Sequence, residues 1–159
     1  MGRIKQSQIT YWCHEIIRSQ AEAGGCYIDA TMGKGNDTLF LCELAGENGK
    51  VLAFDIQQEA LDATRELLRI HGKEQQAELI LDGHEHMGRY AMEESIDVIC
   101  FNFGYLPGGD HKLATTYQTS IEAIGKGLGI RLKFTRRVND RAGLIIVLQD
   151  GKQILNRIA

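Results

Sequence analysis

The sequence lacks the features that mark membrane-spanning and secreted proteins. No apolar run approaches 18 residues, so a membrane-spanning helix is not expected. The first residues, Met1-Gly-Arg-Ile-Lys5, do not contain the apolar core of a secretory signal. We therefore expect a cytoplasmic protein.

The sequence has four cysteines and a single proline. The four cysteines, Cys13, Cys26, Cys42 and Cys100, stand singly in apolar stretches, and no Cys-x-x-Cys pair occurs. This pattern favours reduced core residues over disulfides or a zinc site. The only proline is Pro107. A length of 159 residues suits one domain with a sizeable core, which we expect to span residues 1–159.

The net charge of -3 hides two unequal parts of the chain. Residues 1–125 carry 10 Lys or Arg against 19 Asp or Glu, whereas residues 126–159 carry 8 against 2. Within this basic part, Lys133, Arg136 and Arg137 can contact phosphates, so nucleic acid is an admissible partner. A solvated face or tail is the alternative.

The stretch from Tyr27 to Thr38 organises the rest of the chain. An apolar strand over 26–30 leads into a turn with Gly33 and Gly35, and a helix follows over 39–45. Asn36, Asp37 and Thr38 are predicted to cap this helix. Two glycines allow a ligand close to the backbone, and the free amides of a helix N-terminus offer donors to it.

The residues of this turn discriminate between ligands. A dinucleotide fold prefers a third glycine where Thr38 stands, and a P-loop needs Ser or Thr after Lys34, where Gly35 stands. The carboxylates of Asp29 and Asp37 would repel a pyrophosphate but suit a cationic ligand such as S-adenosylmethionine. An ordinary strand-to-helix turn without a ligand is the alternative.

Periodicity predicts the neighbouring elements. Apolar residues in helical spacing indicate helices over 6–23 and 59–71, and short apolar runs indicate strands over 51–55, 78–82 and 96–101. Asp55 ends the second strand, where it can accept hydrogen bonds from both ribose hydroxyls of an adenosine ligand. Capping of the following helix is the alternative role for Asp55.

Two further segments follow strand ends. Gly83-His-Glu-His-Met87 invites a metal interpretation, but His84 and His86 in this spacing diverge and no compact third ligand is evident, so no metal is expected. A loop over adenine or a capped turn fits better. In the second segment, the Asn102 amide can accept a hydrogen bond from an amine, and Tyr105 can pack on a planar base. A turn with an aromatic plug is the alternative.

Four motifs together resemble one family. Asp29-Ala-Thr-Met-Gly-x-Gly-Asn-Asp-Thr38, Phe54-Asp-Ile-Gln57, Gly83-His-Glu85 and Phe101-Asn-x-Gly-Tyr-Leu-Pro-Gly-Gly-Asp-His111 are similar to motifs of small class I methyltransferases long labelled rRNA methylases. Members act as tRNA 5-aminomethyl-2-thiouridine methyltransferases. The resemblance covers about residues 6–130. It implies S-adenosylmethionine as donor, a tRNA anticodon arm as substrate and a homodimer.

The resemblance also implies roles for individual residues. Asn102, Tyr105 and Pro107 would orient the attacking amine and shape the base slot. The donor would be bound by Asp29, Thr31, Gly33, Gly35, Asn36, Asp37, Asp55, Ile56, Gln57, His84, Glu85 and Asn102. The substrate RNA would be bound by Tyr105, Leu106, Gly108, Asp110 and His111. Lys133, Arg136 and Arg137 lie beyond the resemblance, and their charge alone predicts that they contact RNA phosphates.

The fold implied is a Rossmann-like α/β domain with a mainly parallel sheet in the order 3-2-1-4-5 and helices on both faces. The C-terminal part departs from the family. Residues 131–141 lack the expected Leu-Lys-Pro-Gly-Gly turn, and Gln149–Gln153 replaces a Tyr-x-Gly-His signature. Residues 144–148 can form a fifth strand, but we expect the C-terminal strands to be incomplete, without the closing hairpin.

Two other functions stay open at this point. A nicotinamide-dependent oxidoreductase would use Asp55 similarly, although Thr38 in place of a glycine speaks against it. A catalytically impaired homologue that only binds the donor or RNA is the stronger alternative, because of the altered C-terminal part.

Overall fold

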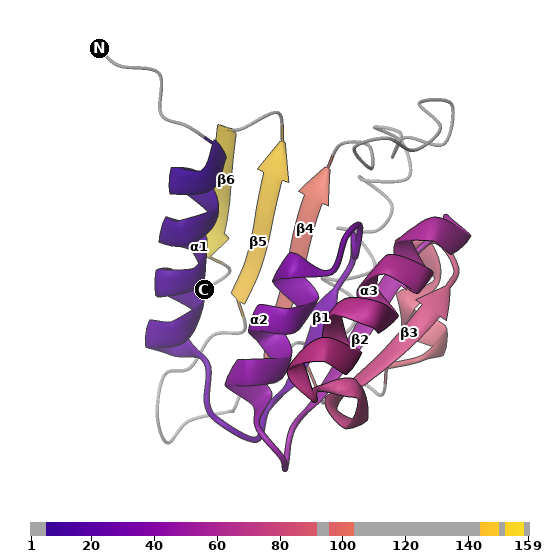
Figure 1. The fold of residues 1–159 in the computed structure, drawn as a ribbon. Coiled ribbons are helices and arrows are strands. Elements are labelled where there is room, and N and C mark those ends of the chain that lie inside the picture. Colours follow the sequence, from indigo (N-terminus) through magenta and orange to yellow (C-terminus); the bar gives the residue numbers. More distant parts are fainter. Residues whose placement is uncertain (1–5, 92–95, 104–143, 150–151, 158–159) are drawn as a thin grey trace.

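The computed structural model describes residues 6–91, 96–103, 144–149 and 152–157. In chain order, the elements are α1 (Gln6–Gln20), β1 (Cys26–Asp29), α2 (Asn36–Ala45), β2 (Lys50–Asp55), α3 (Gln58–His71), η1 (Glu74–Gln76), β3 (Ala77–Leu81), η2 (His84–Arg89), β4 (Val98–Phe103), β5 (Leu144–Gln149) and β6 (Lys152–Arg157). Here α marks an α-helix, η a 3-10 helix and β a strand (Figure 1).

One sheet holds all six described strands, in the order β3-β2-β1-β4-β5-β6. The first five strands are parallel, and β1 lies between β2 and β4, with Ile28 paired to Leu52 on one side and to Ile99 on the other. The predicted parallel order 3-2-1-4-5 is confirmed. Ligands of such sheets bind beyond the carboxyl ends of the strands, so this edge is where a site is expected.

The prediction that no closing hairpin follows the fifth strand is wrong. β6 runs antiparallel to β5, and Gln149 at the end of β5 pairs with Lys152 at the start of β6. The two residues between them in sequence, Asp150-Gly151, form a dipeptide typical of tight hairpin turns. The missing family signature therefore did not mean a missing strand.

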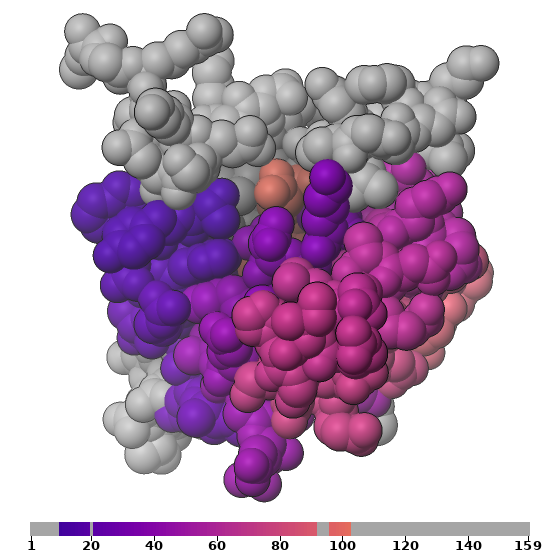
Figure 2. All heavy atoms as spheres, viewed as in Figure 1, coloured from indigo at the N-terminus to yellow at the C-terminus, as the bar shows by residue number. Residues whose placement is uncertain are grey.

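The two faces of the sheet contribute to separate apolar clusters, because neighbouring residues of a strand point to opposite faces. On the face covered by the three α-helices, Tyr27 packs in one cluster with Leu41 of α2 and Leu68 of α3. On the opposite face, Ile28 packs in a cluster with Met87 of η2. Figure 2 shows α1 and α3 flanking α2 on the helical face.

The state of the cysteines agrees with the sequence prediction. All four cysteines are free, and Cys13, Cys42 and Cys100 are buried, as predicted for reduced core residues.

The first helix ends at Gln20 rather than at residue 23. Within the described part of the chain, no helix combines the length and apolar character that crossing a bilayer requires.

Candidate functional site

Three polar residues lie at or next to the carboxyl ends of three neighbouring strands, β2, β1 and β4. Asp29 is the last residue of β1, Asp55 is the last residue of β2, and Asn102 lies two positions beyond Cys100, the partner of Asp29 on β4. Because these strands are parallel and adjacent, the three residues meet at one edge of the sheet. Ligands of parallel sheets bind at this edge.

The turn after β1 is fixed to β2 and α3 by backbone contacts. The amide of Gly33 donates to Asp55 Oδ2 at 2.9 Å, and its carbonyl accepts from Thr64 Oγ1 at 3.2 Å. The Met32 amide donates to the Phe54 carbonyl at 2.9 Å. Gly33 has a φ of 53°, in the left-handed region that favours glycine. The turn is therefore held in place by the strand and helix that follow it.

Gly35 is required both by its backbone angle and by its neighbours. Its φ is 84°, and a Cβ added there would lie 2.7 Å from Thr64 Oγ1 and 3.0 Å from Thr64 Cα. Gly35 is also the N-cap of α2, with no side-chain hydrogen bond at that end of the helix. The α2 helix thus begins against α3 with no room for a side chain.

The predicted capping by Asn36, Asp37 and Thr38 is wrong. These residues form the first turn of α2 itself, where their own side chains cannot occupy the N-cap position. The Asn36 side chain is exposed. Asp37 contacts His14, and the Thr38 hydroxyl donates to Asp29, so both side chains bind residues outside the helix. Asp37 remains an acid at a helix N-terminus, where the helix dipole favours a negative charge.

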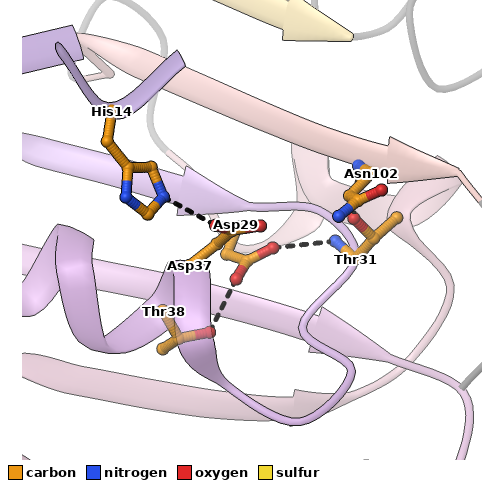
Figure 3. A network of polar contacts seen from close by, with 6 residues as sticks. All are labelled: His14, Asp29, Thr31, Asp37, Thr38 and Asn102. Atoms are coloured by element: carbon orange, nitrogen blue, oxygen red, sulfur yellow. Dashed lines mark hydrogen bonds and ion pairs between the residues drawn. The ribbon is translucent and has the colours of Figure 1, made fainter. Parts of the chain in front are cut away.

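Asp29 is a buried carboxylate, with 1% of its surface exposed. Its Oδ1 accepts from the Thr31 amide at 3.1 Å, and its Oδ2 accepts from Thr38 Oγ1 at 2.7 Å (Figure 3). Burial raises the pKa of Asp29 to about 7, and the charges of Asp37 and Asp55 raise it as well, while the hydrogen bonds from Thr38 and Thr31 lower it. The site thus holds a carboxylate that a nearby cation would stabilise.

His14 of α1 lies next to these residues, although the sequence did not predict it. Its Nε2 lies 2.7 Å from Asp37 Oδ1, and its ring is stacked on Phe40 with a centroid distance of 3.8 Å. Figure 3 shows this pair beside Asp29. The available signal was weak: His14 follows the buried Cys13 and borders the apolar stripe of a helix, and nothing local shows which acid it meets.

Asp55 holds two backbone amides. Its Oδ1 accepts from the Gln57 amide at 3.0 Å, and its Oδ2 accepts from Gly33. Each carboxylate oxygen can accept a second hydrogen bond, so two acceptor positions are left for a ligand. Beside it, Ile56 is 49% exposed, while Gln57 is buried. A carboxylate next to an exposed apolar side chain offers acceptors for a sugar and an apolar surface for a base.

Asn102 is tied to the start of the turn. Its backbone amide donates to Thr31 Oγ1 at 2.6 Å, and Thr31 in turn donates its own amide to Asp29. Figure 3 shows the Asn102 side chain beside Thr31. Thr31 therefore links the end of β4 to the end of β1 by hydrogen bonds.

His84 and Glu85 begin η2. His84 is buried, and its Nδ1 lies 3.0 Å from the Ala30 carbonyl, which can only accept, so Nδ1 donates. His86 contacts Asp82 Oδ1 at 2.7 Å instead. The two histidines diverge as predicted. Among the side chains that the structure describes, no group of three or more metal-binding residues is arranged to hold an ion.

Several predicted residues lie outside the described part of the chain. They are Tyr105, Leu106, Pro107, Gly108, Asp110, His111, Lys133, Arg136 and Arg137. Their proposed roles in binding the substrate stay predictions. The described residues of the site are those expected to meet the donor, together with Asn102.

Comparison with solved structures defines the class of fold. A "putative rRNA-methylase" from Clostridium thermocellum is 37% identical, with a TM-score of 0.78 over 92% of this chain and 73% of that one. A "putative methyltransferase" from Streptococcus mutans, solved in complex with SAH, is 36% identical, with a TM-score of 0.73 over 87% of this chain and 70% of that one. The fold is the Rossmann-like fold of these methyltransferases.

The family follows from the sequence comparison. The family described as "Putative rRNA methylase" matches residues 51–148, and the chain belongs to it. A chloroplastic tRNA (mnm(5)s(2)U34)-methyltransferase of Arabidopsis thaliana is 32% identical over 153 residues, which are 91% of this chain and 52% of that protein. The chain thus spans about half the length of this curated relative.

Proposed function

We propose that this protein is an S-adenosylmethionine-dependent RNA methyltransferase. Its family and the SAH complex of a relative support this activity. The chemistry of the site also supports it: Asp29, Asp37 and Asp55 surround the glycine turn, and this negative charge suits a ligand with a sulfonium and an amine. The same charge would repel the pyrophosphate of a nicotinamide dinucleotide.

The described residues fit this donor. Asp29 would face its cationic methionine end, and the free acceptor positions of Asp55 would take the ribose hydroxyls. Exposed Ile56 would pack on the adenine, with Gln57, His84 and Glu85 in its surroundings. Bound there, S-adenosylmethionine supplies a methyl group already activated by positive sulfur, so the protein need only align the acceptor, exclude water and remove a proton.

The acceptor we propose is the 5-aminomethyl group of wobble 2-thiouridine in a tRNA anticodon arm. One observation carries the role of Asn102 in this proposal: Thr31 joins Asn102 to Asp29 through hydrogen bonds of 2.6 and 3.1 Å. An amide that accepts a hydrogen bond from the amine would then hold the nitrogen lone pair toward the donor. Tyr105 and Pro107 would shape the slot for the base. The named activity of the Arabidopsis relative agrees with this acceptor.

The test is mass analysis of RNA nucleosides after incubation with the donor. We expect 5-methylaminomethyl-2-thiouridine to form in tRNA that carries the unmethylated amine. With Asn102→Ala, turnover should fall about tenfold or more while donor affinity stays nearly intact, because a misaligned nucleophile reacts slowly. An equal loss of donor binding would show that Asn102 is structural. Methylation of ribosomal RNA alone would overturn the tRNA assignment.

Absence of methylation on both RNAs, with donor still bound in calorimetry, would indicate a donor-binding homologue without catalysis. Binding of NAD in place of S-adenosylmethionine would overturn the proposed activity. These outcomes separate a failure of the proposed donor site from a failure of the proposed substrate side. The proposal is for one domain over residues 1–159, a homodimer and a cytoplasmic location, as the sequence predicted.

A further inference from the structure

The contact between His14 and Asp37 joins α1 to the first turn of α2. A carboxylate oxygen only accepts, so the His14 Nε2, at 2.7 Å, is the donor. The ring cannot swing freely, because it lies flat on Phe40 with 4° between the two planes. The Arg18 guanidinium lies 5.0 Å from the centre of the same Phe40 ring. The histidine is therefore held in place by packing as well as by the hydrogen bond.

Asp37 connects this contact to the donor site. Its neighbour Thr38 donates to Asp29, and the Asp37 charge acts on the buried Asp29 carboxyl. His14 and Asp37 are both partly buried, with side-chain exposures of 21% and 18%. Charges are screened less strongly in such a place than in open water. The hydrogen bond from His14 to Asp37 therefore affects how strongly the Asp37 charge acts on the pKa of Asp29.

We propose that His14 is a positioning residue of the proposed donor site, which holds the Asp37 carboxylate by a hydrogen bond and weakens the effect of its negative charge on buried Asp29. This inference rests on the proposed function for its ligand. It adds a residue of α1 to the proposed donor site.

The direction of the effect follows from the charges around Asp29. Without His14, the negative charge of Asp37 would act on Asp29 uncompensated, and Asp29 would take up a proton at a higher pH. A protonated Asp29 would lose its attraction for a cationic ligand. The titratable groups that interact with Asp29 or Asp37 from the packed elements are Cys13 and His14 of α1, Asp55 of β2, Cys42 of α2 and Cys100 of β4.

The first experiment needs no ligand. Carbon NMR would follow the Asp29 carboxyl through a pH titration in the wild type, His14→Phe and His14→Gln. Phe keeps a ring on Phe40 but has no donor, so we expect the pKa of Asp29 to rise by about half to one unit. Gln keeps a donor and should restore part of the difference. His71→Gln, at the exposed end of α3, is the matched control and should change nothing.

The second experiment measures SAH binding by calorimetry between pH 6.5 and 8.5. His14→Phe should bind about three- to tenfold more weakly than the wild type at pH 6.5, the factor that such a pKa rise produces, and the ratio should approach one at pH 8.5. An unchanged Asp29 titration, or a loss of affinity equal at every pH, would overturn the inference. A wild type that does not bind SAH would instead contradict the proposed function, and the ligand-free titration would still decide the role of His14.

Discussion

Asp29 and Asp55 end neighbouring strands in different surroundings. Asp29 is almost fully buried and accepts from a threonine hydroxyl and a backbone amide, whereas Asp55 is partly exposed and accepts from two backbone amides. The pKa of Asp29 is raised to about 7, with burial as the main cause. The two carboxylates therefore have separate consequences for stability and for binding.

Asp29 should make stability fall as the pH rises. Its folded-state pKa of about 7 lies above the unfolded value near 3.8, so its stabilising contribution is full below pH 3.8 and is lost as the pH rises through 7. Each unit of this difference corresponds to about 1.4 kcal/mol. Asp29→Asn, which is always neutral, should therefore unfold at a higher urea concentration than the wild type at pH 8.

The measurement is urea unfolding of both proteins from pH 4 to pH 8. The difference between them should shrink as the pH falls to 4, where Asp29 of the wild type is protonated in the folded state. Asp62→Asn, an exposed acid of α3, is a suitable control and should not change the pH dependence in this way. A gap between Asp29→Asn and wild type that is constant over this range would contradict the burial argument.

Asp55 should matter more for binding. Asp55→Ala removes the carboxylate proposed to accept from both ribose hydroxyls and also releases the Gly33 amide. We expect calorimetry to show S-adenosylmethionine binding weakened by about 1 to 3 kcal/mol, the range for charge-assisted hydrogen bonds that are lost. Asp62→Ala should leave affinity unchanged. Wild-type affinity in Asp55→Ala would remove this residue from the proposed site.

At the scale of elements, the turn before α2 requires glycine at position 35 for two separate reasons, the positive φ and the lack of space for a Cβ. Gly35 and Gly72 both have positive φ, at 84° and 62°, but only Gly35 has atoms of Thr64 where a Cβ would stand. Gly72→Ala should cost about 1 to 2 kcal/mol for the backbone angle alone. Gly35→Ala should cost about 1 to 3 kcal/mol more, because α3 must move. Equal unfolding free energies in urea would contradict the close packing.

Local sequence patterns predicted most elements but not their contacts. The strand, glycine turn and helix around Gly33 were predictable, because apolar periodicity and glycine placement are local signals. The role of Thr38 was not, because a cap and a partner for buried Asp29 use the same side chain. Likewise, Asp150-Gly151 was interpreted through a missing family signature rather than as a hairpin signal.

At the scale of the whole molecule, the order of five strands and the edge that holds Asp29, Asp55 and Asn102 were predictable, because parallel sheets bring strand ends together. The pairing of His14 with Asp37 was not. The two residues are 23 positions apart, and their meeting depends on how α1 packs beside α2. Tertiary packing of this kind leaves no periodic trace in the sequence.

The uneven charge along the chain also belongs to this scale. If Lys133, Arg136 and Arg137 contact tRNA phosphates, replacing all three by Gln should weaken tRNA binding. The salt dependence should become shallower by up to about 0.7 to 0.9 in slope for each lost contact. The reason is that residues 1–125, with 19 acidic side chains, cannot by themselves attract a polyanion.

Binding titrations over a range of salt concentrations measure this slope, and S-adenosylmethionine affinity serves as the control that should not change. An unaltered slope would mean that these cations are a solvated surface and that RNA is held elsewhere.

The Thr31 contacts also have a consequence for the order in which the protein assembles during synthesis. The glycine turn is tied to Asp55 only 22 residues further along, whereas Thr31 must wait for Asn102, 71 residues away. Ribosomes add about 5 to 20 residues per second, so β1 and β2 can pair seconds before β4 emerges. The proposed donor half of the site can therefore form on the nascent chain before Asn102, the residue proposed to orient the acceptor, joins it.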